Sequence, residues 1–289
     1  MFDEDSCNLN NDTLLIYEFA HNSIPHQSAA IYGQYLITVP NKMGTISMYD
    51  MNQKQRVYTC IMAPLEGLDP YGNVKYHCNQ CTFSNKKFME NDTFPLLYIS
   101  QRADSLYRCS ALVYRIVEKR NALNEIYSFD VQLVQTIIFP PMTKENALGN
   151  VNVVYSSSED LFYLYSRNNN RKDSNFRKCR ISKVQVPKIE TDTIYLSNND
   201  IMDSYDIECS ALNMQGGAIF ENKLYIAQGF YKSGAINIRV VNLIQKRLEK
   251  TYDLLSQGVT WEPEGCFFYE GNLHLASSRY IFQIKMNQK

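Results

Sequence analysis

The fold is decided by a hairpin pattern that occurs more than once along the chain. Residues 214–229 read MQGGAIFENKLYIAQG, and residues 263–278 read PEGCFFYEGNLHLASS. In each stretch a turn is followed by a short apolar strand, a polar reversal and a second strand in which apolar and polar residues alternate, which is the pattern of a β-hairpin. A small unit that recurs along one chain is typical of repeat architectures.

Three more stretches fit the same pattern when they are aligned on the first apolar strand and on the aromatic residue that ends it. The five copies start at Gln27, Cys78, Asn150, Gln215 and Glu264. The starts are 51, 72, 65 and 49 residues apart (27 to 78, 78 to 150, 150 to 215, 215 to 264). Each interval holds four antiparallel strands with their turns, which is one blade of a β-propeller. We therefore predict an all-β, five-bladed β-propeller that forms a single domain over residues 1–289, with blades starting near residues 27, 78, 150, 215 and 264.

The two ends of the chain support a closed ring. Residues 13–20 (TLLIYEFA) read as a strand that belongs to no copy, and the fifth copy ends after three strands with YIFQIKMNQK. A ring of blades has no exposed edges only if its last sheet is completed. We therefore expect the last blade to be closed by the N-terminal strand.

Composition and charge remove several classes of partner. Among 289 residues, 29 Lys and Arg stand against 30 Asp and Glu, so no basic field exists that would attract nucleic acid. No apolar run approaches the ~18–20 residues of a membrane span. The N-terminus is acidic and polar, unlike a secretory signal. Two locations stay open: a secreted or cell-surface protein whose leader is removed, or a cytoplasmic protein.

The cysteines and the known short motifs give no support for a metal or a cofactor. The chain has eight cysteines, and Cys78 and Cys81 form a C-x-x-C pair with no second pair to complete a zinc site. We interpret both as strand residues, because they lie in an apolar run. G-x-S-x-G, the P-loop, H-E-x-x-H and G-x-G-x-x-G are absent from the sequence. We therefore expect no metal and no cofactor.

The aligned starts of the blades indicate where a ligand would bind. The first strand of each propeller blade lines the central channel, so its first residues gather at one mouth. A concave site with a few convergent polar groups is the usual place for a small ligand. The alternative is that these side chains only bind water and neighbouring strand ends. The candidate ligand-binding residues are Gln27, Asn79, Asn150, Gln215, Trp261 and Glu264.

Four residues near this mouth are candidates for catalysis. If His26 and His77 face each other, they form a proton-transfer pair or hold a metal; otherwise each caps a turn. Glu262 and Glu264 are two apart, so an extended segment would point both at the same space, as in glycoside hydrolysis. A structural alternative is that either Glu accepts backbone N–H groups and fixes the strand. Trp261 would stack on a sugar ring or fill space between blades.

Three motifs carry a family resemblance. Residues 77–83 (HCNQCTF), residues 215–229 and residues 262–277 (EPEGCFFYEGNLHLAS) resemble the blade signatures of bacterial five-bladed propellers of the helveticin-like group. The resemblance implies a secreted or surface-acting protein that binds cell-wall or other glycans. The matching positions are His77, Asn79, Gln215, Gly216, Glu262, Glu264 and Gly265. The chain departs from the pattern at Gln80, where an acidic residue is expected.

Two functions from different classes follow, and a third stays open. The first is a binding module that captures a carbohydrate or another polar ligand at the channel mouth. The second is a polysaccharide-acting glycosidase or lyase that uses the Glu and His residues there; a protein-interaction scaffold is the third. An enzyme needs a pair of carboxyl groups with perturbed pKa values, whereas a binder needs aromatic faces and amides.

The basic segment 166–180 is interpreted as a solvated loop.

Overall fold

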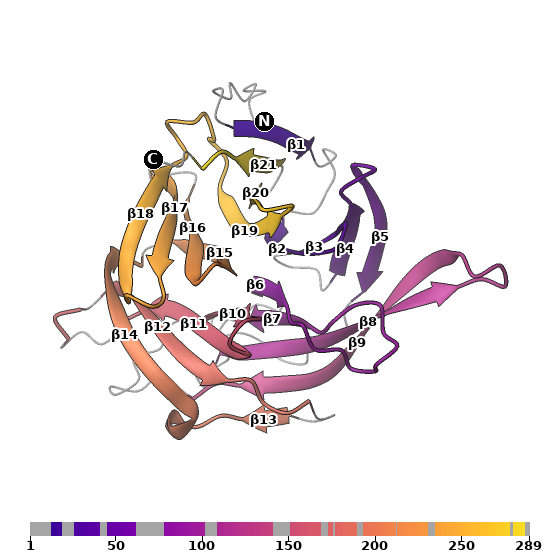
Figure 1. The fold of residues 1–289 in the computed structure, drawn as a ribbon, viewed down its shortest axis with the longest axis horizontal. Helices are drawn as coiled ribbons and strands as arrows, with labels where there is room; N and C mark the ends of the chain where they lie inside the picture. Colours follow the sequence, from indigo (N-terminus) through magenta and orange to yellow (C-terminus); the bar gives the residue numbers. More distant parts are fainter. Residues whose placement is uncertain are drawn as a thin grey trace, which may run out of the picture.

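The chain forms a ring of five β-sheets around a central axis, a five-bladed β-propeller (Figure 1). The computed structural model describes residues 13–18, 26–40, 45–61, 78–101, 109–140, 151–168, 173–175, 177–189, 193–211, 213–230, 235–277 and 280–286. The predicted fold class is therefore confirmed, and the order of the blades around the ring follows the order of the sequence copies.

Each blade begins with its innermost strand and continues outward through antiparallel neighbours. Blade 1 consists of β2 (His26–Tyr32), β3 (Tyr35–Pro40), β4 (Thr45–Asp50) and β5 (Gln55–Ile61). Blade 2 consists of β6 (Cys78–Phe83), β7 (Leu97–Gln101), β8 (Ser110–Arg120) and β9 (Ile126–Ile138), with β13 (Thr193–Tyr195) added to it. Blade 3 consists of β10 (Asn152–Ser156), β11 (Leu161–Arg167), β12 (Lys178–Gln185) and β14 (Ile201–Ser210). Blade 4 consists of β15 (Met214–Phe220), β16 (Lys223–Gly229), β17 (Ile236–Asn242) and β18 (Arg247–Asp253). Blade 5 consists of β19 (Pro263–Tyr269), β20 (Asn272–Ser277), β21 (Tyr280–Ile284) and β1 (Thr13–Glu18).

The first and last strands of the chain lie side by side in blade 5 (Figure 1). β1 pairs antiparallel with β21, so that Thr13 stands opposite Ile284 and Glu18 opposite Tyr280. The register shifts once, between Leu15 and Tyr17. The outer strand of this sheet thus comes from the opposite end of the sequence from the other three.

The two hairpins that share a sequence pattern also share a turn. Glu221 and Asn222 connect β15 to β16 with positive φ angles of 48° and 59°, and Glu270 and Gly271 connect β19 to β20 with 49° and 74°. Two-residue hairpin loops in which both residues have positive φ match the right-handed twist of the strands, and Asn and Gly tolerate this conformation best. The recurring E-N and E-G dipeptides are therefore the local reason that the two hairpins look alike.

The hydrophobic core is divided into clusters that lie between neighbouring blades. Many inner strands are buried on both faces, because each sheet packs between two neighbouring blades. Blades 1 and 2 share an aromatic group in which the rings of Tyr35 and Phe94 lie 5.6 Å apart and those of Phe94 and Phe129 lie 5.7 Å apart. This arrangement explains why the strands read as nearly continuous apolar runs.

Blade 2 departs from the regular four-stranded pattern, and its fifth strand comes from the segment that joins two strands of blade 3. The β8–β9 hairpin extends beyond the ring, and Leu123 at its tip is 79% exposed (Figure 1). β13, which lies between β12 and β14 in sequence, pairs in parallel with β9 of blade 2. The segment predicted as a solvated basic loop, 166–180, includes the start of β12, and Arg180 is ion-paired with Asp206 at 2.7 Å. That end of the segment is therefore part of the sheet.

Candidate functional site

The starts of the inner strands meet at one mouth of the channel, where amide and carboxyl side chains bind each other. Gln27 of β2 donates from Nε2 to Oε2 of Glu264 in β19 at 2.9 Å. Gln215 of β15 donates from Nε2 to Oε1 of Glu262 at 2.9 Å. We call these four residues the amide mouth. Residues 237 positions apart in the sequence are thus in direct contact, as the blade alignment requires.

Burial raises the pKa of both carboxyl groups in the amide mouth. The Glu264 side chain is almost completely buried, and its pKa lies well above the usual value because of desolvation and, second, the neighbouring Glu262 charge. Desolvation also raises the pKa of Glu262, while the hydrogen bond from Gln215 acts in the opposite direction. A carboxyl group with a raised pKa keeps its proton to a higher pH and can donate it.

The other predicted site residues are placed less centrally. Asn79 lies in β6 and is half-buried. Trp261 packs with its ring 5.3 Å from that of Tyr280, within the cluster between blades 4 and 5. His26 begins β2, where its backbone pairs with Pro40. His77, Asn150 and the side chain of His26 lie outside the described residues.

The inner strand of blade 3 begins with a buried polar residue. Asn152, the first residue of β10, is 4% exposed, and its Oδ1 atom makes no hydrogen bond within the described part of the chain. Buried carbonyl oxygens without a partner are uncommon and call for a donor. The inner strand of blade 3 therefore contributes an unsatisfied acceptor.

The buried side chain of Gln80 connects the inner strands of three blades. Its Oε1 accepts from the backbone N–H of Gly217 at 2.8 Å and from the hydroxyl of Ser28 at 3.2 Å. Its Nε2 donates to the carbonyl oxygens of Gly217 at 2.7 Å and Cys81 at 2.8 Å. All four hydrogen-bonding positions of the amide are used, so Gln80 links blade 2 to blades 1 and 4.

Close approach of the strands at this level depends on glycine. A Cβ atom at Gly216 would lie 2.4 Å from Gln80 Oε1, 2.8 Å from the carbonyl oxygen of Glu264 and 2.9 Å from Ser28 Oγ. These separations are too short for non-bonded atoms. Glycine therefore permits β15 to approach β6, β19 and β2 at the centre of the ring.

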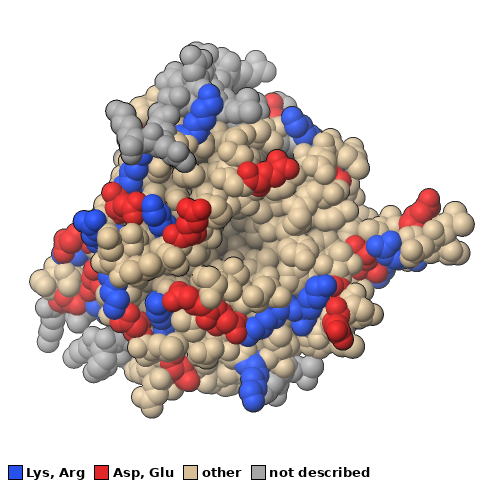
Figure 2. Space-filling model, viewed as in Figure 1, with Lys and Arg blue, Asp and Glu red and all other residues tan. Residues whose placement is uncertain are grey.

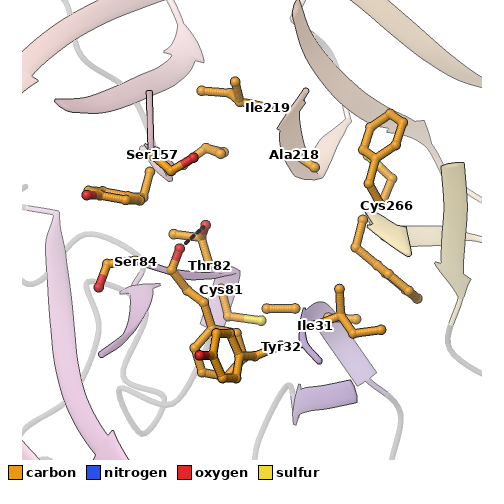
Figure 3. Close-up of a pocket in the computed structure, with 17 residues that line it drawn as sticks. Ile31, Tyr32, Cys81, Thr82, Ser84, Ser157, Ala218, Ile219 and Cys266 are labelled. Atoms are coloured by element: carbon orange, nitrogen blue, oxygen red, sulfur yellow. Dashed lines mark hydrogen bonds between the residues drawn. The ribbon is translucent and has the colours of Figure 1, made fainter. Parts of the chain in front are cut away.

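Beyond the Gln80 amide, the opposite mouth holds an open cavity of about 270 Å³ (Figure 3). All five inner strands, or the turns that follow them, line it. Its wall combines aromatic rings with small apolar and hydroxyl side chains and has no charged residue. The lining residues used below are Tyr32, Thr82, Phe83, Tyr155, Ser157 and Phe267. We call this cavity the aromatic mouth.

Charged side chains are arranged around the centre of the ring rather than within it. Figure 2 shows a central hollow with uncharged walls and with acidic and basic groups set around it. At the aromatic mouth, Lys86 of the β6–β7 loop is ion-paired with Asp160 of the β10–β11 turn at 2.7 Å. The cation is neutralised there, so this mouth offers little attraction to an anion.

The sequence alignment contained a signal for the aromatic mouth that was not used. The aromatic residue that ends the first strand of each copy served only to align the blades. In three blades that residue lines the cavity: Tyr32, Phe83 and Tyr155. Residues that mark the end of a repeated strand lie at the same end of the ring, so the marker itself indicated a second mouth.

The described part of the chain shows no group of three or more His, Cys, Asp and Glu side chains placed to hold a metal ion. Cys78 and Cys81 are buried within β6, and desolvation raises the pKa of each thiol to about 12. Both are strand residues, as interpreted from the sequence. Among the described residues, no helix is long and apolar enough to cross a membrane.

Comparison with known proteins supports the fold and gives no information about function. No family model matches the chain, and no curated protein is similar in sequence. The PQQ-bound aldose sugar dehydrogenase from Streptomyces coelicolor has a TM-score of 0.51 at 10% identity, over 94% of this chain and 97% of that one. A putative oxidoreductase (glucose dehydrogenase) from Thermus thermophilus has a TM-score of 0.50 at 9% identity, over 94% and 99%. At this level of identity the likeness concerns architecture.

Proposed function

We propose that the protein is a binding module that captures a small, neutral, polar ligand at the aromatic mouth, with a single sugar ring as the ligand class that fits best. The observation that carries the proposal is the cavity lined by all five blades without one charged side chain. The ligand is assigned to this mouth rather than to the amide mouth, because the four residues of the amide mouth are bonded to one another.

The chemistry of the wall supports a sugar ring. Aromatic faces contact the C–H groups of a sugar, and the hydroxyls of Thr82 and Ser157 offer donors and acceptors to its O–H groups. Within the described part of the chain, the Thr82 hydroxyl makes one hydrogen bond, a long one of 3.5 Å to the carbonyl oxygen of Phe83. The volume is slightly below the ~300–1,000 Å³ of typical small-molecule sites, which favours one ring over an oligosaccharide.

The helveticin-like resemblance is compatible with this proposal and stays a prediction. It implies glycan binding by a secreted or surface-acting propeller. The proposal places that binding at the ends of the inner strands rather than at their starts.

A thermal-shift and calorimetric screen tests the proposal. Neutral monosaccharides such as glucose, galactose and N-acetylglucosamine are compared with glucuronate as the charged counterpart. At ten times the dissociation constant, a bound sugar raises Tm by about 2–3 °C. We expect this shift with at least one neutral sugar and not with glucuronate.

Matched variants locate the site. Tyr32→Ala removes a ring from the cavity wall, whereas Tyr195→Ala removes an exposed ring from β13, the outermost strand of blade 2. We expect Tyr32→Ala to weaken binding at least tenfold and Tyr195→Ala to leave it unchanged. Equal binding by both variants, or a complete lack of binding by the native protein, contradicts the proposal.

A second candidate function rests on the raised pKa values of Glu262 and Glu264. Glu262 is the better candidate for a general acid, since it is only half-buried while Glu264 is enclosed. The protein would then cleave a polysaccharide at the amide mouth. Release of reducing sugars by the native protein that is lost in Glu262→Gln supports this function; release that persists in Glu262→Gln rejects it.

A further inference from the structure

A pair of cysteines on the outer part of blade 3 lies away from both mouths. Cys179 is in β12 and Cys209 is in the neighbouring strand β14. Cys179 pairs with Ile207, and the register shifts between Lys178 and Cys179, so that Lys178 pairs with Ser210. Cys209 is two residues from Ile207 and therefore on the same face of the strand, and the bulge brings it toward Cys179.

Contacts confirm that the two thiols are neighbours. Both are free, and both are buried members of the same hydrophobic cluster between blades 3 and 4. Arg239 of β17 reaches this point from blade 4 and donates from Nη1 to the carbonyl oxygen of Ser210 at 2.7 Å. A dithiol next to a guanidinium group is the arrangement in which one thiol ionises readily.

The two thiols differ in their electrostatic surroundings. The interaction with Cys179, together with the Arg239 charge, lowers the pKa of the Cys209 thiol, while the same interaction and burial raise the pKa of Cys179. The Arg239 charge lowers the pKa of Cys179 as well, and Asp206 adds a smaller effect that raises it. The other nearby charges, Lys178 and Glu208, are ion-paired with each other. Cys209 is therefore the nucleophile, and Cys179 is the proton-bearing partner.

We propose that Cys179 and Cys209 form a reversible disulfide when a hydroperoxide oxidises Cys209. The Cys209 sulfur attacks the hydroperoxide: an S–O bond forms, the O–O bond breaks, and the leaving oxygen takes a proton and departs as alcohol or water. Sulfur is oxidised by two electrons to sulfenic acid, and the peroxide is reduced. The Cys179 sulfur then attacks Cys209: an S–S bond forms, the S–O bond breaks, and the hydroxide leaves as water with the Cys179 proton.

The disulfide would fix the junction between blades 3 and 4. The Ser210 carbonyl, next to Cys209, accepts from Arg239 and also from Nε2 of Gln228 at 3.1 Å, so the end of β14 is already held by blade 4. A covalent bond to β12 would anchor the same end within blade 3. Oxidation would then restrain the outer strand without touching the cavity.

Cys60 supplies an internal control. Cys60 is 7% exposed and Cys209 is 9% exposed, so access to the two thiols is similar. Burial raises the pKa of Cys60 to about 11. The thiolate fraction falls tenfold for each unit by which the pKa exceeds the pH. The thiolate of higher pKa is intrinsically more nucleophilic, which offsets about half of this loss on a logarithmic scale. At pH 7 we therefore expect Cys209 to react at least about tenfold faster than Cys60.

The experiment uses the full chain with Cys7→Ser, since Cys7 lies outside the described residues. The protein is treated with hydrogen peroxide at pH 7, the remaining thiols are alkylated, and peptides are identified by mass spectrometry. The expected product joins the peptides of Cys179 and Cys209 with the loss of two hydrogens and is reversed by dithiothreitol. Oxidation of Cys60 at the same rate, no cross-link, or a Cys209 sulfenic acid that persists beside an intact Cys179 each overturns the proposal.

Variants separate the two steps and guard against misfolding. In Cys179→Ser, the Cys209 sulfenic acid is expected to accumulate and to react with dimedone. Arg239→Gln is expected to slow oxidation of Cys209 about threefold or more, and Arg239→Lys to restore it, with circular dichroism verifying the fold of each variant. Equal rates in the Gln and Lys variants would show that the Arg239 charge has no part in the reaction and would overturn its assigned role.

Discussion

The two mouths of the channel are built by the same five strands and yet differ in what their side chains do. At the amide mouth, Gln27 binds Glu264 and Gln215 binds Glu262, so polar groups from different blades satisfy each other. At the aromatic mouth, the wall has no charged residue and encloses an open cavity. Convergent polar residues therefore mark the closed end of this ring, and repeated aromatic residues mark the open end.

The difference follows from the geometry of a narrow ring. Where five strands converge, long amide and carboxyl side chains reach across to neighbouring blades, and a buried polar atom is stable only with a partner. Gln80 is the extreme case, because its amide bonds to three other residues in three blades, counting its own. Polar convergence in this ring thus holds the blades together, and the following predictions test that conclusion from the largest expected effect to the smallest.

Gly216→Ala is expected to cause the largest loss. Its Cβ would lie within 3 Å of Gln80, Glu264 and Ser28, and one of those contacts is backbone that cannot move aside. Overpacking of this kind costs about 3 kcal/mol or more, seen as a lower urea midpoint or as insoluble protein. The matched control is Gly33→Ala, where no atom lies within 4 Å of the new Cβ and only the φ of +55° is unfavourable. Its cost is about 1 kcal/mol; equal losses in the two variants contradict a tight centre.

Gln80→Leu is expected to destabilise the protein by about 3 kcal/mol. Leucine keeps the bulk but leaves the backbone N–H and C=O of Gly217 without their partners in a buried place. The measurement is the free energy of unfolding in urea. Gln132→Leu, on the exposed side of β9, is the control and should change stability by less than about 0.5 kcal/mol. A small change in the free energy of unfolding for Gln80→Leu would mean that the Gln80 amide does not stabilise the packing of the inner strands.

Glu264→Gln is expected to change how stability depends on pH. The pKa of Glu264 is raised in the folded protein, so above pH 4.5 the unfolded chain loses this proton while the folded protein keeps it. Stability from this group is complete below the unfolded pKa and declines as the pH rises. Residue 264 of the variant cannot ionise. From pH 5 to pH 8, the urea midpoint of unfolding of the native protein should therefore fall relative to that of the variant.

The control for that pH series is Glu249→Gln. Lys223 lowers the pKa of the exposed Glu249, so its contribution is lost only as the pH falls toward and below 4.5. Between pH 5 and pH 8 the profile of this variant should run parallel to that of the native protein. A parallel profile for Glu264→Gln as well would show that Glu264 is ionised throughout this range.

Much of the fold could be predicted from the sequence because hairpin signals are local. The alternation of residues 215–229 and 264–278 and their E-N and E-G turns specify strands and reversals within about 15 residues. The parallel pairing of β13 with β9 could not be predicted, since a three-residue strand carries no pattern and its partner lies in another blade.

The site was predictable in part, for a physical reason. Blade alignment placed Gln27 and Glu264 at one end of the ring, and their hydrogen bond joins them there. Alignment identifies which residues meet but not whether they satisfy each other or leave room for a ligand. Gln80 shows this limit: in the sequence it was a departure from an expected acidic residue, and in the structure its neutral amide matches both a donor and an acceptor on Gly217, which a carboxylate could not do.

The smallest effect on stability is expected at the open end, for Thr82→Val. The substitution conserves the shape of a cavity-lining side chain. It removes a hydroxyl that donates a long hydrogen bond of 3.5 Å to the carbonyl oxygen of Phe83. Stability should change by less than about 0.5 kcal/mol, whereas the affinity for a neutral sugar should fall about tenfold if the hydroxyl binds it. The free energy of unfolding and a calorimetric titration measure the two quantities on the same sample. Gln80 lies only two residues away in the same strand. If Thr82→Val lost as much stability as Gln80→Leu, both parts of β6 would stabilise the ring, and the conclusion that the Thr82 end is available to a ligand would be wrong.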